Sequence, residues 1–171
     1  MTDAELDLRA AVLRDAFDGS FAEPPPAVKD DSERFLAIEA AGTAYAIAQA
    51  EVAALFVDRP VAALPSAAPT CLGVAMLDGE PVAVHSLAGL LGHGASDGPP
   101  PRWTLRVAES ALGLAFDRLD GQLRVPRDAI APWQSGMMHT LIAASISADG
   151  ATRPVVRLDA VVALLAGTRE E

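Results

Sequence analysis

Beyond residue 34, hydrophobic residues recur at every second position, in many short runs separated by glycine, proline or polar residues. A period of two is typical of strands with one buried face, whereas an amphipathic helix requires a period near 3.6 residues. Alanine is abundant, so helix propensities alone would predict helix throughout the chain. The alternation therefore decides the fold class, and it predicts a mainly β protein.

The individual runs give approximate positions for the strands. Residues 35–40 alternate before a turn at Gly42-Thr43, and the next run contains Tyr45 and Ile47, which predicts a hairpin. Further strands are predicted at 103–108, 112–116, 119–125, 140–146 and 155–158.

Helix is expected only in short pieces of this region. Residues 86–91 and 160–165 fit short helices, each with a glycine after its end. The glycine- and proline-rich loop 92–101 is expected to divide the body into two strand-rich halves. Many short strands predict small barrels or a sandwich, because barrel closure removes exposed sheet edges.

The first residues of the chain follow a different period. Leu6, Ala10, Leu13 and Phe17 recur at helical spacing, which predicts an amphipathic helix over residues 1–19. Three consecutive prolines follow, so residues 20–32 are interpreted as a linker and residues 33–168 as the folded domain. The apolar stripe of the helix must be buried, either on this domain or in a groove of another protein.

Charge and cysteine content limit the classes of function. The chain has 23 acidic and 13 basic residues, a net charge of −10, so nucleic acid is not an expected partner. Cys71 is the only cysteine, which excludes an intramolecular disulfide and favours the cytoplasm. Proline, glycine and polar residues interrupt the uncharged stretch 129–148, so no membrane insertion is expected. The acidic first residues do not fit a signal peptide.

Candidate catalytic residues are few. His85 and Ser86 could form a triad with Asp117, but no Gly-x-Ser-x-Gly turn presents a serine. The three histidines lack partners at the spacing of a zinc site. We therefore expect no enzyme, metal or cofactor, and a small β-barrel enzyme using His85 or Asp117 is the alternative of a different class.

Several segments carry a family resemblance through their order and spacing. They are Phe35-Leu-Ala-Ile, Tyr45-Ala-Ile, Val52-Ala-Ala-Leu55, Gly73-Val-Ala-Met-Leu-Asp-Gly79 and Pro81-Val-Ala-Val84. A second block, Leu112-Gly-Leu-Ala-Phe-Asp117-Arg-Leu119, precedes a closing strand and helix at 155–165. In this order, residues 33–166 resemble the CheW-like adaptor domain of bacterial chemosensory systems.

The resemblance implies a fold and a set of partners. The fold would be two packed SH3-like, five-stranded β-barrel subdomains, with a short C-terminal helix. Family members are scaffolds: one surface holds the regulatory domain of a CheA-type histidine kinase, and a groove accepts the helical cytoplasmic tip of a methyl-accepting receptor. Such a protein would be cytoplasmic, at receptor arrays near the inner membrane. The partner-binding residues implied are Val52, Leu55, Gly73, Asp78, Gly79, Gly113 and Asp117.

Two points about these residues stay open at the level of sequence. Val52 and Leu55 could equally be plain core residues. Gly73 and Gly79 could either allow a partner backbone to approach closely or only supply the positive φ angle of a simple turn.

Position 78 departs from the family pattern. The family usually has arginine there, and this chain has Asp78, so the charge at the contact would be inverted. Ala54, Ala83 and Ser86 stand where glutamate, proline and aspartate are common. These departures are consistent with an adaptor whose partner has changed with it. They are equally consistent with a modulator that binds receptor or another adaptor and engages the kinase weakly.

Overall fold

The computed structural model describes residues 31–65, 68–94, 98–133 and 140–167. The fold given below is that of the unit beginning at Ser32. The helix predicted for residues 1–19, with its stripe of Leu6, Ala10, Leu13 and Phe17, lies outside the described residues, as does most of the predicted linker.

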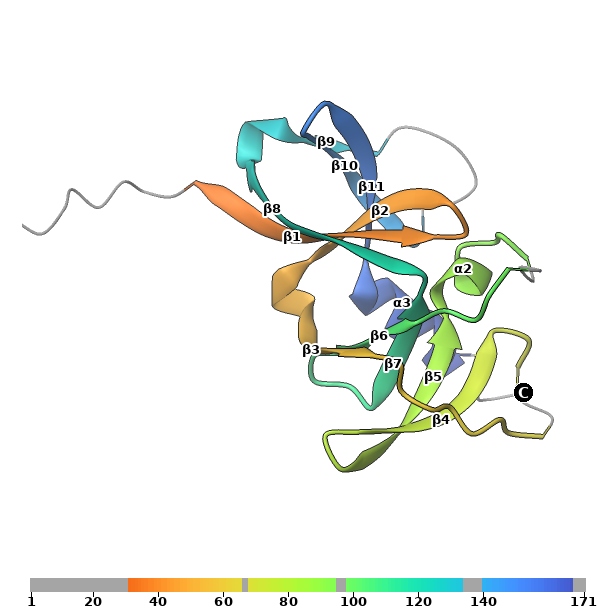
Figure 1. Cartoon of the computed structure of the whole chain (residues 1–171). Helices are drawn as coiled ribbons and strands as arrows, with labels where there is room; N and C mark the ends of the chain where they lie inside the picture. The colour runs from red at the N-terminus through yellow and green to blue at the C-terminus, as the bar shows by residue number, and fades with distance from the viewer. Residues whose placement is uncertain (1–30, 66–67, 95–97, 134–139, 168–171) are drawn as a thin grey trace, which may run out of the picture. The chain divides into compact units, whose positions relative to one another are not determined.

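The described residues form two β-sheets (Figure 1). In spatial order, the six-stranded sheet consists of β8 (Arg118–Pro126), β1 (Ser32–Ala40), β2 (Thr43–Ala48), β11 (Ala151–Val156), β10 (Ile142–Ala148) and β9 (Ile130–Pro132). The five-stranded sheet consists of β3 (Val52–Val57), β6 (Trp103–Val107), β7 (Leu112–Phe116), β5 (Glu80–Ser86) and β4 (Cys71–Leu77). Three short helical segments lie between strands, namely η1 (Gln49–Glu51), α2 (Leu87–Leu90) and η2 (Arg127–Ala129), and the helix α3 (Leu158–Gly167) follows β11.

The mainly β architecture predicted from the alternation is confirmed. One sheet has the expected five strands, the other has six, and closure of either sheet into an SH3-like barrel stays a prediction. The loop 92–101 lies between two strand-rich halves of the chain, β1 to β5 and β6 to β11, as expected, but these halves are not the two sheets, because each sheet takes strands from both sides of the loop. Two parallel pairings, β2 with β11 and β5 with β7, join strands that are distant in sequence. Hydrophobic periodicity carries no information on such pairings.

Three tight turns fix the register of the hairpins. The pairs Ala41-Gly42, Asp78-Gly79 and Asp149-Gly150 all have positive φ angles at both residues, between 50° and 80°. Two such residues are typical of the two-residue turns that match the twist of an antiparallel pair. The turn at Asp149-Gly150 pairs β11 with β10. The last strand therefore begins at Ala151 and ends before Leu158, which corrects the prediction of a strand at 155–158.

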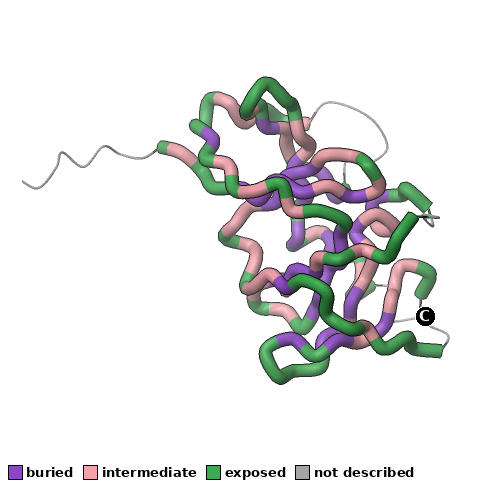
Figure 2. The backbone as a smooth tube through the Cα atoms, viewed as in Figure 1, coloured by how far each residue is buried: buried purple, intermediate pink, exposed green. Residues whose placement is uncertain are grey.

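A core shared by both sheets holds this unit together. It includes Leu36 and Ile38 of β1, Leu105 of β6, Leu114 of β7 and Leu158 of α3. All five residues of β7 are buried, because this strand contributes to the shared core on one face and to a second core of the five-stranded sheet on the other. Figure 2 shows the buried segments of the chain along the junction of the two sheets. Each fully buried leucine contributes about 2 kcal/mol to folding.

Candidate protein-interaction site

The two apolar residues singled out from the sequence lie on β3, an edge strand of the five-stranded sheet. In a regular strand, residues three positions apart face opposite sides. Here the register shifts between Val52 and Ala54, and both Val52 and Leu55 pack, partly buried, against the shared core. Val57, two residues after Leu55, faces the same side of the strand and is 46% exposed. We call Val52, Leu55 and Val57 the β3 row.

Both readings of Val52 and Leu55 fit this position. They pack on the core, as the plain interpretation predicts, and they keep exposed surface on a strand whose second edge has no neighbouring strand in the sheet. Such an edge is open to a partner. Contact with a partner itself stays a prediction.

Gly73 is needed for contact within the chain. It is buried, its φ is +139°, and a Cβ atom built on it would lie 2.0 Å from the carbonyl oxygen of Ala62. The segment around Ala62 pairs with β4 through two hydrogen bonds: Ala62 N–H donates to Val74 O (2.8 Å), and Val74 N–H donates to Ala62 O (2.9 Å). The backbone that approaches Gly73 closely is therefore that of Ala62 in the same chain.

Asp78 and Gly79 form the turn between β4 and β5. Asp78 has a φ of 51°, a left-handed conformation that aspartate tolerates better than most residues. Its side chain is 55% exposed, and one carboxylate oxygen lies 3.7 Å from Nη1 of Arg106 on β6. Arg106 also forms an ion pair with Glu80. The aspartate therefore has a local role in the turn, and its charge faces an arginine of the same chain.

Gly113 and Asp117 flank the passage from one sheet to the other. Gly113 is buried, and a Cβ atom on it would lie 3.2 Å from Cγ2 of Val84, so it serves close packing of β7 on β5. Asp117 connects β7 to β8 and accepts a hydrogen bond from the N–H of Ala41 (2.7 Å). It thereby holds the turn between β1 and β2. These internal roles were not predicted from the sequence, and partner contacts by either residue stay a prediction.

Glu51, next to the β3 row, connects η1 to α3. Burial raises the pKa of its carboxyl group, although backbone N–H groups of Asp159 and Leu158 at the start of α3 hydrogen-bond the carboxylate and act in the opposite direction. A carboxylate at a helix N-terminus is favoured by the helix dipole. The alternation of hydrophobic residues could not predict this contact, because Glu51 and the start of α3 are far apart in the sequence.

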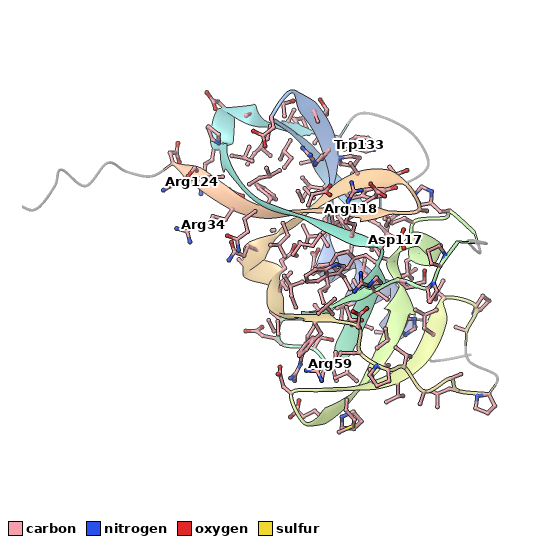
Figure 3. All side chains as sticks on the ribbon, viewed as in Figure 1. Arg34, Arg59, Asp117, Arg118, Arg124 and Trp133 are labelled. Carbon is pink, nitrogen blue, oxygen red and sulfur yellow. The ribbon has the colours of Figure 1, made fainter. Side chains whose placement is uncertain are left out.

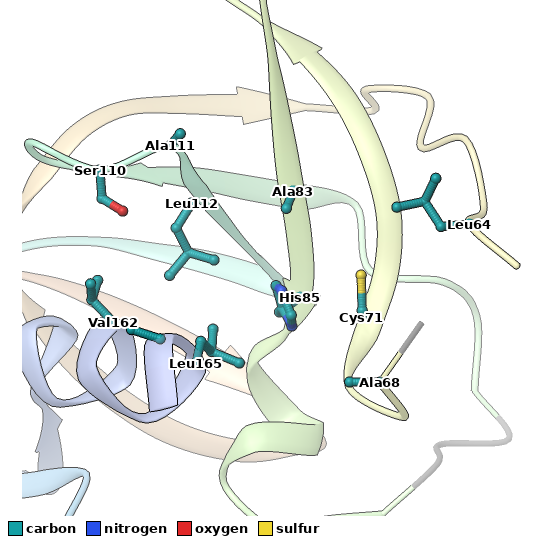
Figure 4. Close-up of a pocket in the computed structure, with 11 residues that line it drawn as sticks. Leu64, Ala68, Cys71, Ala83, His85, Ser110, Ala111, Leu112, Val162 and Leu165 are labelled. Carbon is teal, nitrogen blue, oxygen red and sulfur yellow. The ribbon is translucent and has the colours of Figure 1, made fainter. Parts of the chain in front are cut away.

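A second apolar surface lies on another side of the shared core. A cavity of about 420 Å³ opens between α3, β4, β5 and the loop that precedes β7 (Figure 4). Its lining includes Leu64, Cys71, His85, Leu112 and Leu165, and contains no residue of β3 or β8. Cys71 is half-buried and opposite His85 in the β4–β5 pairing. We call this opening the α3 cavity.

The residues considered for a catalytic triad each make a contact elsewhere. His85 Nδ1 lies 3.4 Å from Thr70 Oγ1. Ser86 Oγ caps α2 by accepting the N–H of Gly89 (3.1 Å), and Asp117 holds Ala41. Within the described residues, no group of three potential metal ligands was found. The same part of the chain contains no helix of the length and apolarity that a membrane span requires.

Two small sheets around one core, with apolar and charged side chains on exposed strand edges, are typical of a protein-interaction domain. A family model described as the CheW-like domain matches residues 34–166. The chain therefore belongs to the CheW-like domain family.

Among solved structures, the chain is similar to the scaffolding protein TtCheW from Thermoanaerobacter tengcongensis. The match has a TM-score of 0.67 and 15% sequence identity, and it covers 74% of this chain and 89% of that chain. At this identity the similarity concerns the fold. No curated protein matched this sequence.

Proposed function

We propose that this chain is a chemosensory adaptor that joins a methyl-accepting receptor to the regulatory domain of a CheA-type histidine kinase. It acts by binding and performs no chemistry. The observation that carries the proposal is the match of the CheW-like domain to residues 34–166. The adaptor works in the cytoplasm, at receptor arrays near the inner membrane.

The β3 row supports this proposal. Val52 and Leu55 are two of the residues for which the family resemblance implies partner contact, and Val57 extends the apolar surface to the end of the strand. Apolar side chains fixed on a rigid strand lose little entropy when a partner covers them. A receptor helix that packs here would transmit a signal only if its active and inactive states bind the adaptor differently.

Reconstitution of receptor control over the kinase tests the proposal. Receptor in membranes, CheA-type kinase and this chain are mixed, and kinase autophosphorylation is measured with and without the receptor's ligand. We expect the ligand to change the phosphorylation rate only when the chain is present. Equal control with and without the chain would contradict the proposal.

Asp78 favours a second candidate, a modulator that binds receptor or another adaptor but engages the kinase weakly. The exposed carboxylates of Asp78 and Glu80 surround Arg106, so this turn presents a net negative charge where the family usually has arginine. A partner surface that is complementary to arginine would be repelled by it.

Two variants at one position separate the candidates. Asp78→Asn removes the charge and keeps a residue that tolerates the left-handed turn, and Asp78→Arg restores the family's charge. For the modulator, affinity for the kinase regulatory domain rises from wild type to Asp78→Asn to Asp78→Arg, by about fivefold or more overall. Wild-type affinity equal to that of Asp78→Arg would remove the basis of the modulator candidate.

A further inference from the structure

We infer that Arg34 and Arg124, paired across β1 and β8, form a site for a carboxylate of an acidic helical segment that packs beside the β3 row. In the antiparallel pairing of β1 and β8, Arg34 lies directly opposite Arg124. Directly opposite residues share a face of the sheet, with their Cβ atoms about 5 Å apart. The register therefore places two guanidinium groups side by side, and Figure 3 shows both at the same end of the pair.

Arg34 differs from most arginines of the chain in its surroundings. It is exposed and makes no ion pair or hydrogen bond with any residue in the described ranges. Five other arginines in those ranges pair with carboxylates, namely Arg102, Arg106, Arg118, Arg127 and Arg157. Opposite like charges on one sheet face repel each other. Arg124 donates a hydrogen bond from Nε to Oγ of Ser32 (2.9 Å), so the guanidinium that stays available for an external anion is that of Arg34, in a chain with a net charge of −10.

The position of the pair connects it to the β3 row. Phe35 pairs with Ala48, the last residue of β2, so Arg34 stands level with the start of η1, which β1 contacts. The segment η1 leads directly into Val52. Arg34 and Leu36 are two residues apart on β1, so they face the same side of the sheet. Leu36 belongs to the shared core, and Val52 and Leu55 pack against that core. The arginine pair and the β3 row therefore lie on the same side of the six-stranded sheet.

This arrangement defines the chemistry of the segment that would bind. The β3 row provides apolar contact, and the planar guanidinium of Arg34 provides donors that match the two oxygens of a carboxylate. An amphipathic helix with a glutamate or aspartate beside its apolar stripe meets both requirements. The apolar contact holds the helix, and the arginine pair selects its charge and register.

A pair of synthetic helical peptides tests this inference on the full-length chain. Both carry the same leucine stripe, and they differ only in one residue beside it, glutamate or glutamine. We expect the glutamate peptide to bind about fivefold more tightly at about 0.1 M salt, and the preference to fall at about 1 M salt as screening increases. Arg34→Gln should abolish the preference, and Arg34→Glu should reverse it.

Arg59→Gln is the matched control. Arg59 is an exposed arginine that lies just after the end of β3, with its Cζ atom 5.5 Å from the centroid of the Phe56 ring, and its removal changes the net charge equally. The control should keep the preference for glutamate. Arg34→Gln should not lower the melting temperature, because Arg34 makes no ion pair or hydrogen bond with any residue in the described ranges. A fall in melting temperature would point to a structural role of Arg34 and would count against the inference.

Equal binding of the two peptides, a preference that survives Arg34→Gln, or no binding of either peptide would each overturn the inference. The inference rests on the proposed function only for the identity of the natural partner. Loss of receptor control in the kinase assay together with an intact peptide preference would reject the function alone. Intact receptor control together with equal peptide binding would reject the inference alone.

Discussion

The shared core has apolar surface on two sides, the β3 row and the α3 cavity, and the two differ in the charges around them. The α3 cavity has a volume of about 420 Å³, and Leu64, which lines it, is 48% exposed. Its lining has no Asp, Glu, Lys or Arg side chain. The β3 row has Glu51 immediately before it and Arg34 level with the start of η1.

Under the proposal above, the amount of exposed apolar surface alone does not identify the interaction site. Apolar contact supplies affinity for almost any apolar partner, whereas fixed charges next to it exclude partners of the wrong charge. The β3 row combines the two, whereas the α3 cavity offers mainly apolar contact, together with the side chains of Cys71, His85 and Ser110. We therefore propose that partner selection occurs at the β3 row.

The first prediction tests whether the two sides belong to one cooperative unit. Leu114 is fully buried in the core that both sides contact. Leu114→Ala should destabilise the unit by about 3 kcal/mol, through lost burial and the cavity that remains. Thermal unfolding should show one transition at a lower temperature, since both sheets depend on this core. Two separate transitions, with only one shifted to lower temperature, would show that the β3 row and the α3 cavity do not belong to one cooperative unit.

The second prediction concerns β4, the strand that contributes Cys71 to the lining of the α3 cavity. Gly73→Ala places a Cβ atom against the carbonyl oxygen of Ala62 at a φ that suits glycine, and should cost about 2 kcal/mol. Gly79→Ala is the control, because that glycine also has positive φ but no atom within 4 Å of the added Cβ. It should cost about 1 kcal/mol. Hydrogen exchange should show faster opening at Ala62 and Val74 in the first variant only, and equal exchange in both would contradict the account of Gly73.

The smallest predicted effect is a pH dependence of the free energy of unfolding, which comes from the contact between Glu51, next to the β3 row, and the start of α3. The pKa of Glu51 is raised, so its contribution to stability is present below the unfolded-state pKa and is lost as pH rises through the folded-state value. Relative to wild type, Glu51→Gln should gain stability as pH rises from the acid range to neutrality. The gain should stay below about 1 kcal/mol, because the group is only partly buried and solvent screens it.

Asp159 provides the comparison of opposite sign. Arg157 holds the pKa of Asp159 low, so its contribution is present at neutral pH and is lost as pH falls through the folded-state value. Relative to wild type, Asp159→Asn should lose stability as pH rises from strong acid to neutrality. Urea unfolding at several pH values measures both, and slopes of the same sign would contradict the assignment.

Much of the fold follows from local pattern, and the site follows from it only in part. The alternation predicted the β1–β2 hairpin and the strands near 103–107 and 112–116, because the larger apolar residues of a strand that face one core recur at every second position. The parallel pairings could not be predicted in this way, because they depend on which distant strands meet. The turn at Asp149-Gly150 was a readable signal that the strand prediction at 155–158 missed.

The site shows the same limit. Val52 and Leu55 share a side through a register shift that strict alternation does not predict. The pairing of Arg34 with Arg124 and the contact of Asp78 with Arg106 depend on strand order and register. Residues far apart in sequence become neighbours only when the sheets form, and no single segment records this.

The most direct test of the account changes one leucine on each side. Leu55 and Leu165 are both partly buried leucines that pack against the shared core, so Leu55→Asn and Leu165→Asn are matched substitutions. Affinities of the two full-length variants for a receptor cytoplasmic hairpin and for a kinase regulatory domain are measured by calorimetry, after equal melting temperatures are verified. We predict that Leu55→Asn weakens binding of at least one partner about tenfold or more, and that Leu165→Asn leaves both affinities within about twofold. Loss of binding in Leu165→Asn with normal binding in Leu55→Asn would contradict the account.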